Sequence, residues 1–312
     1  MKETDRGILE QIEKVVEKTE HSENANHCRS AKEVIGKVIE ASKEASERKS
    51  CVKGLPTGFF DLDYMLEGLQ NGNLILLAGR KSMGKTELAL SIVHHVIMKE
   101  NVMTAIFSPR FTGEHIMEMI LSMESNQYCG TIHRGLRSPE EWTNLEKSAE
   151  ELGKAPLFID DEPYLTVEEI RTRCLKLYHD HDDKVGLVVV DCLQLLDCEG
   201  DETGKDRKKK IAKSLKDLAM EIDCPVIVIS ELPSDGEKRW NERPELSDLD
   251  DSDYTKQYAD VILFLYMDKS EDNKEPESRE AEIIIAKHRD GFYGKVKLRP
   301  DLGYSRFRNM VV

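Results

Sequence analysis

Residues 79–86 read Gly79-Arg80-Lys81-Ser82-Met83-Gly84-Lys85-Thr86 and match every fixed position of the phosphate-binding pattern Gly-x4-Gly-Lys-Thr. The apolar run 74–78 before this loop is typical of a buried strand, and residues 87–93 after it predict a helix with one apolar face. A loop between strand and helix can surround phosphates with backbone N–H groups, while Lys85 reaches the β and γ oxygens and Thr86 holds Mg²⁺. All eight residues are therefore candidates for binding ATP, and a plain glycine-rich turn is the alternative.

An acidic group is needed beside Thr86 to hold the metal, and the stretch 186–191 supplies one. It reads Gly186-Leu187-Val188-Val189-Val190-Asp191, an apolar run that ends in a carboxylate. Central parallel strands have this pattern when their C-terminal ends open on a ligand crevice. Asp191 is thus the candidate Walker B residue and, with Thr86, the candidate metal ligand. The alternative is a helix cap that follows a buried strand.

Strand-like and helix-like segments alternate through the chain, which predicts an α/β fold with a mostly parallel sheet covered on both faces. The expected strands are 74–78, 103–108, 156–159, 186–191, 226–230 and 260–266, followed by a hairpin made of 283–285 and 296–298. The expected helices are 86–99, 113–124, 139–151, 166–180 and 205–221, and residues 233–258 read as a long polar loop.

Composition restricts the class of protein. The net charge of −15 and the pI of about 5.2 argue against tight non-specific DNA binding by the free chain. No apolar run is long enough for a bilayer and no signal peptide is recognisable, so no membrane contact is expected. The seven cysteines form no Cys-x-x-Cys pair, which indicates reduced thiols and a cytoplasmic location.

Several further segments occur in one order and carry a resemblance. They are 55–63 (LPTGFFDLD), 80–86, 191–195 (DCLQL), 243–249 (RPELSDL), 259–266 (ADVILFLY) and 282–291 (EIIIAKHRDG). Together they resemble the motor domain of DnaB-type replicative DNA helicases over roughly residues 30–309. Recombinases and circadian-clock ATPases share the core fold of that domain but do not resemble the later segments.

The resemblance implies a RecA-like domain that assembles with identical subunits into a six-membered ring around single-stranded DNA, with ATP held between neighbours and a replication protein as a further partner. By position, Lys287 and Arg289 resemble the pair that reaches the next subunit's nucleotide, a role that suits the phosphate-matching fork of arginine. The alternative is a basic strand edge beside solvent. Catalytic candidates are thus Lys85, Asp191, Arg289 and, as explained below, Glu231.

The resemblance also suggests a division at residue 50. Residues 1–50 are expected to form a helical extension and linker, and 51–312 the RecA-like ATPase domain. The family has a helical collar domain before its motor, whereas about fifty residues precede Gly54 here, so we expect the collar to be missing. Two helical apolar stripes lie in this part, one at Ile8, Leu9, Ile12, Val15 and Val16 and one at Val34, Ile35, Val38 and Ile39. The second resembles the linker helix. The first is equally suited to bind a groove of a partner or to pack against its own domain.

Two departures from the family affect hydrolysis. Where the family has Ser-Leu-Glu-Met, with a Glu that polarises the attacking water, this chain has Ser108-Pro109-Arg110-Phe111. A guanidinium cannot accept a proton at neutral pH, so Arg110 cannot act as a general base. Glu231 stands where the family has a Gln that senses the γ-phosphate. We expect Arg110 and Glu231 to form a salt bridge that slows hydrolysis, and the alternative is that Glu231 takes over as the base.

The loops that the resemblance assigns to DNA have changed as well. An Arg-Glu-Ser-Gly loop of the family is replaced by Asp250-Asp251-Ser252-Asp253, and carboxylates repel a phosphate backbone. The other expected channel loop, residues 198–210, ends in the basic run 207–210, which suits either phosphate contact or a solvated helix face. Two functions remain open: an ATP-driven translocase on single-stranded DNA with weakened hydrolysis, or a catalytically degenerate nucleotide-binding protein that regulates or joins another ATPase ring.

Overall fold

The computed structural model describes residues 30–47, 52–135, 138–181, 184–197, 204–233, 243–249, 254–268 and 279–310. The chain divides into two units, Met1–Ser50 and Cys51–Val312. In the first unit, helix α2 spans Ala31–Glu47 and includes the predicted stripe, whose four apolar side chains are exposed. Its start is capped because Ser30 and Glu33 exchange side-chain to backbone hydrogen bonds. The other predicted stripe, at residues 8–16, lies outside the described residues.

The described strands of the second unit form one nine-stranded sheet in the order β3-β2-β4-β5-β1-β6-β7-β8-β9. Strands β1 to β6 pair in parallel, and β7 to β9 continue the sheet as an antiparallel meander. Their bounds are β1 Leu74–Gly79, β2 Thr104–Phe107, β3 Leu157–Asp160, β4 Leu187–Asp191, β5 Val226–Glu231, β6 Val261–Met267, β7 Ala281–His288, β8 Gly294–Asp301 and β9 Arg306–Asn309.

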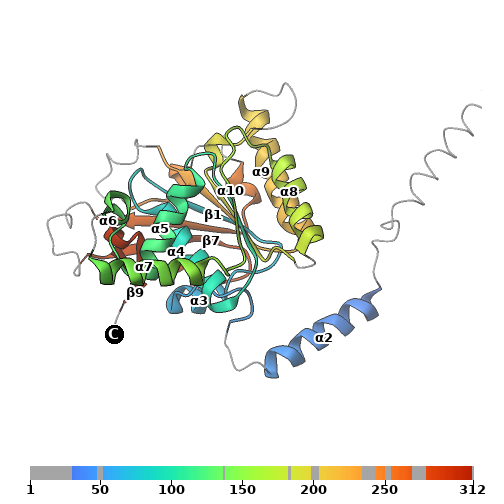
Figure 1. The fold of residues 1–312 in the computed structure, drawn as a ribbon. Helices are drawn as coiled ribbons and strands as arrows, with labels where there is room; N and C mark the ends of the chain where they lie inside the picture. The colour runs from blue at the N-terminus through green and yellow to red at the C-terminus, as the bar shows by residue number, and fades with distance from the viewer. Residues whose placement is uncertain are drawn as a thin grey trace, which may run out of the picture. The chain divides into compact units, whose positions relative to one another are not determined.

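Helices cover both faces of this sheet (Figure 1). Helices α4 and α5 pack on one face with Ile75 and Leu77, and α8 and α9 pack on the other with Leu74 and Leu76. Neighbouring residues of one strand thus enter opposite cores, which explains why β1 is apolar at nearly every position. The bounds are α3 Phe60–Leu66, α4 Lys85–His95 with a π-helical extension Val96–Glu100, α5 Gly113–Ser125, α6 Cys129–Arg134, α7 Pro139–Leu152, α8 Val167–His181, α9 Gly204–Glu221 and α10 Thr255–Tyr258.

The predicted α/β fold with a mostly parallel sheet is confirmed, and each predicted strand and helix from 74 to 231 has a counterpart in the structure. The sequence did not predict the short elements α3, α6 and β9, nor α10 inside the stretch read as a polar loop. In the part of the chain that the structure describes, no helix is long and apolar enough to cross a bilayer.

The two-sided burial of β1 gives a test of the core. Leu76 is fully buried, and Leu76→Ala should lower the free energy of unfolding by about 2 to 5 kcal/mol, because it leaves a cavity in the central layer. Urea unfolding followed by circular dichroism measures the loss. Leu175→Ala on α8 is the control, since Leu175 is 39% exposed. Equal losses in the two variants would contradict the assignment of β1 to the core.

Candidate nucleotide-binding site

The phosphate-binding loop joins the C-terminal end of β1 to the first turn of α4, as its sequence predicted. Gly84 caps α4 with a φ of 80°, and a Cβ at this position would come within 2.9 Å of the Phe307 ring. A Cβ on Gly79 would lie 2.8 Å from the backbone oxygen of Leu265. Both glycines are therefore required by close packing, and Gly84 also by its left-handed backbone.

Three side chains of the loop and of β4 meet beneath this turn. The Lys85 ammonium is buried and donates to the backbone carbonyl of Arg80 at 2.7 Å. The Thr86 hydroxyl donates to Oδ2 of Asp191 at 2.6 Å. Burial raises the pKa of the Asp191 carboxyl, and the Thr86 hydrogen bond opposes that rise. Burial lowers the pKa of Lys85, and the charge of Glu231 opposes that change.

This arrangement fits ATP with Mg²⁺. Oδ1 of Asp191 is buried without a hydrogen-bond partner, as a metal-directed oxygen would be before it binds its cation. A P-loop protein holds Mg²⁺ with one hydroxyl, one carboxylate and the phosphates themselves. That mode needs no dense ligand cluster, and among the described residues no group of three His, Cys, Asp or Glu could hold a metal ion. Lys85, Thr86 and Asp191 are the residues that would hold the triphosphate and its metal.

The predicted ion pair between Arg110 and Glu231 is present. Nη1 of Arg110 lies 3.7 Å from Oε2 of Glu231, and each side chain is about one third exposed. The Arg110 guanidinium also lies over the Phe111 ring, 5.3 Å from its centroid, and the Phe111 N–H donates to Ser108 Oγ. The turn after β2 therefore places a cation where the family has its water-polarising carboxylate.

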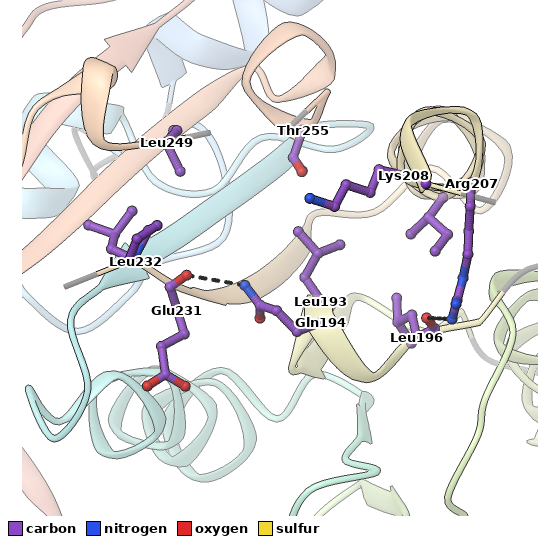
Figure 2. Close-up of a pocket in the computed structure, with 12 residues that line it drawn as sticks. Leu193, Gln194, Leu196, Arg207, Lys208, Glu231, Leu232, Leu249 and Thr255 are labelled. Atoms are coloured by element: carbon purple, nitrogen blue, oxygen red, sulfur yellow. Dashed lines mark hydrogen bonds between the residues drawn. The ribbon is translucent and has the colours of Figure 1, made fainter. Parts of the chain in front are cut away.

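Glu231 contributes to the site in two directions (Figure 2). Its backbone carbonyl accepts a hydrogen bond from Gln194 Nε2 at 3.2 Å, and Gln194 also donates to Ser230 Oγ at 2.9 Å. The Glu231 carboxyl group points away from Leu249 and Thr255, toward the side of Arg110. A cavity of about 390 Å³ lies on the Gln194 side, between the end of β5 and the start of α9. The sequence assigned no role to Gln194, although its segment carried the resemblance.

Within the chain, Lys287 and Arg289 bind residues other than those of the phosphate-binding loop. The Lys287 ammonium donates to the carbonyls of Lys256, Gln257 and Ala259, which closes the C-terminal end of α10. The exposed Arg289 donates to Asp260 Oδ1 at 3.0 Å. Their predicted contact with a neighbouring subunit's nucleotide stays a prediction.

The structure describes only part of the two loops expected to contact DNA. Residues 250–253 and 198–203 lie outside the described residues. The basic run 207–210 forms the first turns of α9, where Arg207 pairs with Asp197 at 3.1 Å and Lys209 lies 5.9 Å from the centre of the Tyr254 ring. Three of its four side chains are exposed, which is typical of a solvated helix face.

The fold and the loop define a RecA-like P-loop ATPase domain. An ATPase domain of known structure superposes with a TM-score of 0.84 at 30% identity, covering 91% of this chain and all of that domain. A KaiC-like protein from Pyrococcus horikoshii, at 16% identity and a TM-score of 0.53, shares the fold alone.

The sequence model of the DnaB-like helicase C-terminal domain matches residues 54–309. The replicative DNA helicase DnaC of Bacillus subtilis is 33% identical over 307 residues, which cover 97% of this chain and 67% of that protein. A DnaB-like replicative helicase structure, solved to study its interactions with primase, gives a TM-score of 0.80 at 28% identity over 98% of this chain and 75% of that one. The chain belongs to the family of DnaB-like helicase C-terminal domains, as the resemblance predicted.

The buried Asp191 carboxylate gives a test of the metal site. Replacing Mg²⁺ with EDTA should weaken ATPγS binding to the wild-type chain, whereas Asp191→Asn should bind about equally with and without Mg²⁺. The variant loses the anionic oxygen beside Thr86, and we expect a loss of about 10- to 100-fold in metal affinity. Isothermal titration with and without metal checks this. Asp197→Asn is the control, because Asp197 pairs with Arg207 on α9; a full Mg²⁺ effect in Asp191→Asn would remove Asp191 from the metal site.

Proposed function

We propose that this chain is an ATP- and Mg²⁺-binding, DnaB-type helicase domain of DNA replication that works as a subunit of a homo-oligomeric ring on single-stranded DNA, with slow hydrolysis. The observation that carries the proposal is the Lys85, Thr86 and Asp191 cluster at the strand ends, because it keeps each group needed for the triphosphate and its metal. Membership of the helicase family supports replication as the process.

Each residue of the site has a separate task in this proposal. The backbone of 79–86 binds phosphate oxygens, and Lys85 leaves the Arg80 carbonyl to neutralise the β and γ oxygens. Thr86 and Asp191, which are hydrogen-bonded to each other, would hold the metal. When bound, ATP with Mg²⁺ supplies a phosphoryl group that can be transferred to water.

The activation of the attacking water is the step for which this chain has the weakest candidate residues. Arg110 replaces the carboxylate that does this in the family, and it cannot accept a proton. Glu231 is the other catalytic candidate, but its carboxylate pairs with the Arg110 cation at 3.7 Å. We therefore infer a slow chemical step.

Membership of the helicase family supports the proposed ring and its partners. Six subunits, with Lys287 and Arg289 directed at the neighbour's nucleotide, would complete each ATP site. Such a contact requires Lys287 to leave the end of α10 and Arg289 to leave Asp260. A related helicase has been studied with primase, and a replication protein of that kind is the partner we propose. DNA contact is weakened by the acidic residues 250–253, and a cytoplasmic location is part of the proposal.

A second function is favoured by the Arg110–Glu231 pair. Two positions that handle the γ-phosphate and water have changed charge together, and in the structure they satisfy each other. This is what a nucleotide-holding subunit would need if it no longer hydrolysed ATP and instead joined or regulated another ATPase ring.

Steady-state hydrolysis with and without single-stranded DNA, beside a nucleotide-binding titration, separates the two functions. Lys85→Ala should lose at least about 100-fold in ATP affinity, since the main cation for the phosphates is removed. Slow turnover that DNA stimulates and Lys85→Ala abolishes would support the helicase subunit. Binding without turnover would support the regulatory subunit, and unchanged binding in Lys85→Ala would refute the proposed site.

The double variant Arg110→Glu with Glu231→Gln restores the residue types of the family at both positions. It should raise the hydrolysis rate by about 100-fold or more, the usual contribution of a positioned general base. Arg110→Gln with Glu231→Gln is the matched control, because it removes the ion pair without adding a carboxylate. An equal rate in the two double variants would show that a missing base is not the defect.

A further inference from the structure

Arg110 follows the C-terminal end of β2, Glu231 is the last residue of β5, and β4 with Asp191 at its end lies between those strands. The pair therefore bridges two strand ends above the residue proposed to hold the metal. Glu231 is also paired in register with Gly79, the first residue of the phosphate-binding loop. The ion pair therefore lies beside that loop.

The contact is one that a stronger anion can replace. Its N–O separation of 3.7 Å is too long for a hydrogen bond, and about a third of each side chain is exposed. Solvent screens such a pair, so it contributes little to the stability of the fold. A phosphate group offers more charge and a geometry that matches the guanidinium fork.

The cation is nonetheless held in place. The Arg110 guanidinium stacks on Phe111, and the Phe111 ring lies 5.2 Å from that of His115 on α5. The Phe111 N–H is fixed to Ser108 Oγ, and Ser108 is buried at the end of β2. Loss of the Glu231 contact therefore need not release Arg110 from the site, because the aromatic side and the turn still position it.

We propose that Arg110 distinguishes ATP from ADP in this chain, by exchanging Glu231 for the γ-phosphate. This inference rests on the proposed ATP site. The loop and Lys85 bind the phosphates that ADP and ATP share. The γ-phosphate of ATP extends beyond them, toward the strand ends where Arg110 lies. With ADP the Arg110–Glu231 pair persists. With ATP, Arg110 binds the γ-phosphate. The Glu231 carboxylate then has no ion pair with Arg110 and repels the γ-phosphate.

Affinities for ADP and for ATPγS, both with Mg²⁺, test this assignment without relying on turnover. Arg110→Ala should weaken ATPγS binding by about tenfold or more and change ADP binding by less than about twofold, because one charge-assisted contact is lost only with the longer nucleotide. Glu231→Gln should have the opposite effect, a tighter binding of ATPγS with ADP little changed. The ratio of the two affinities is the decisive quantity.

The matched controls are Arg171→Ala and Glu221→Gln, which disrupt another exposed Arg–Glu pair, between α8 and α9, and should leave the ratio unchanged. Thermal unfolding of each variant checks that the fold is retained. Equal weakening of ADP and ATPγS in Arg110→Ala would mean that Arg110 only shapes the loop. Unchanged affinities for both nucleotides in that variant would mean that Arg110 does not meet the γ-phosphate. Either result overturns the inference while the ATP site stands. Unchanged binding of both nucleotides in Lys85→Ala would overturn the ATP site itself.

Discussion

Parallel pairing of β2, β4, β5 and β1 brings the C-terminal ends of four neighbouring strands to one edge of the sheet. In this register Gly79 is opposite Glu231, Asp191 is opposite Ile229, and Phe107 is opposite Val190. The loop 79–86, the Asp191 carboxylate and the Arg110–Glu231 pair all lie at or just after those ends. A shift of one strand by a single residue would turn its side chains to the other face and separate the cluster. The site therefore depends on the register, which the two apolar cores on either side of the sheet hold in place.

The groups proposed to bind the nucleotide match the expected pattern, whereas the groups at the two positions expected to act in hydrolysis do not. Lys85, Thr86 and Asp191 form the compact set that a nucleotide and its metal need, and each is engaged in an interaction that a ligand can replace. Arg110 and Glu231 instead form an ion pair at the two positions that the resemblance assigns to hydrolysis. The family's Glu and Gln carry one negative charge at these positions, whereas Arg110 and Glu231 together carry none, and the carboxylate expected to act as the base is replaced by a cation. Such a site suits a long-lived complex with ATP better than rapid turnover.

Local sequence patterns predicted the central strands and the candidate nucleotide site. The elements that they did not predict depend on packing between segments that are distant in the sequence. Residues 79–86 and 186–191 have motifs whose backbone and burial requirements are visible in sequence, and the charges of Arg110 and Glu231 predicted their pairing. The segment 306–309 alternates arginine with other residues and gave no strand signal, yet β9 places Phe307 against Gly84 of the loop. Lys287 closes α10, which lies about 30 residues earlier in a stretch that reads as polar loop. Neither contact follows from spacing or periodicity, because each depends on how distant segments meet.

Firm binding of ATP together with poor activation of water can be measured in a single turnover. The protein, in excess over radiolabelled ATP with Mg²⁺ and single-stranded DNA, is quenched at successive times, and the bound nucleotide is separated into ATP and ADP. We expect the label to be recovered mainly as ATP long after binding is complete. Conversion to ADP as fast as binding would contradict it, because water would then be activated efficiently although Arg110 stands in place of the carboxylate that the resemblance expects.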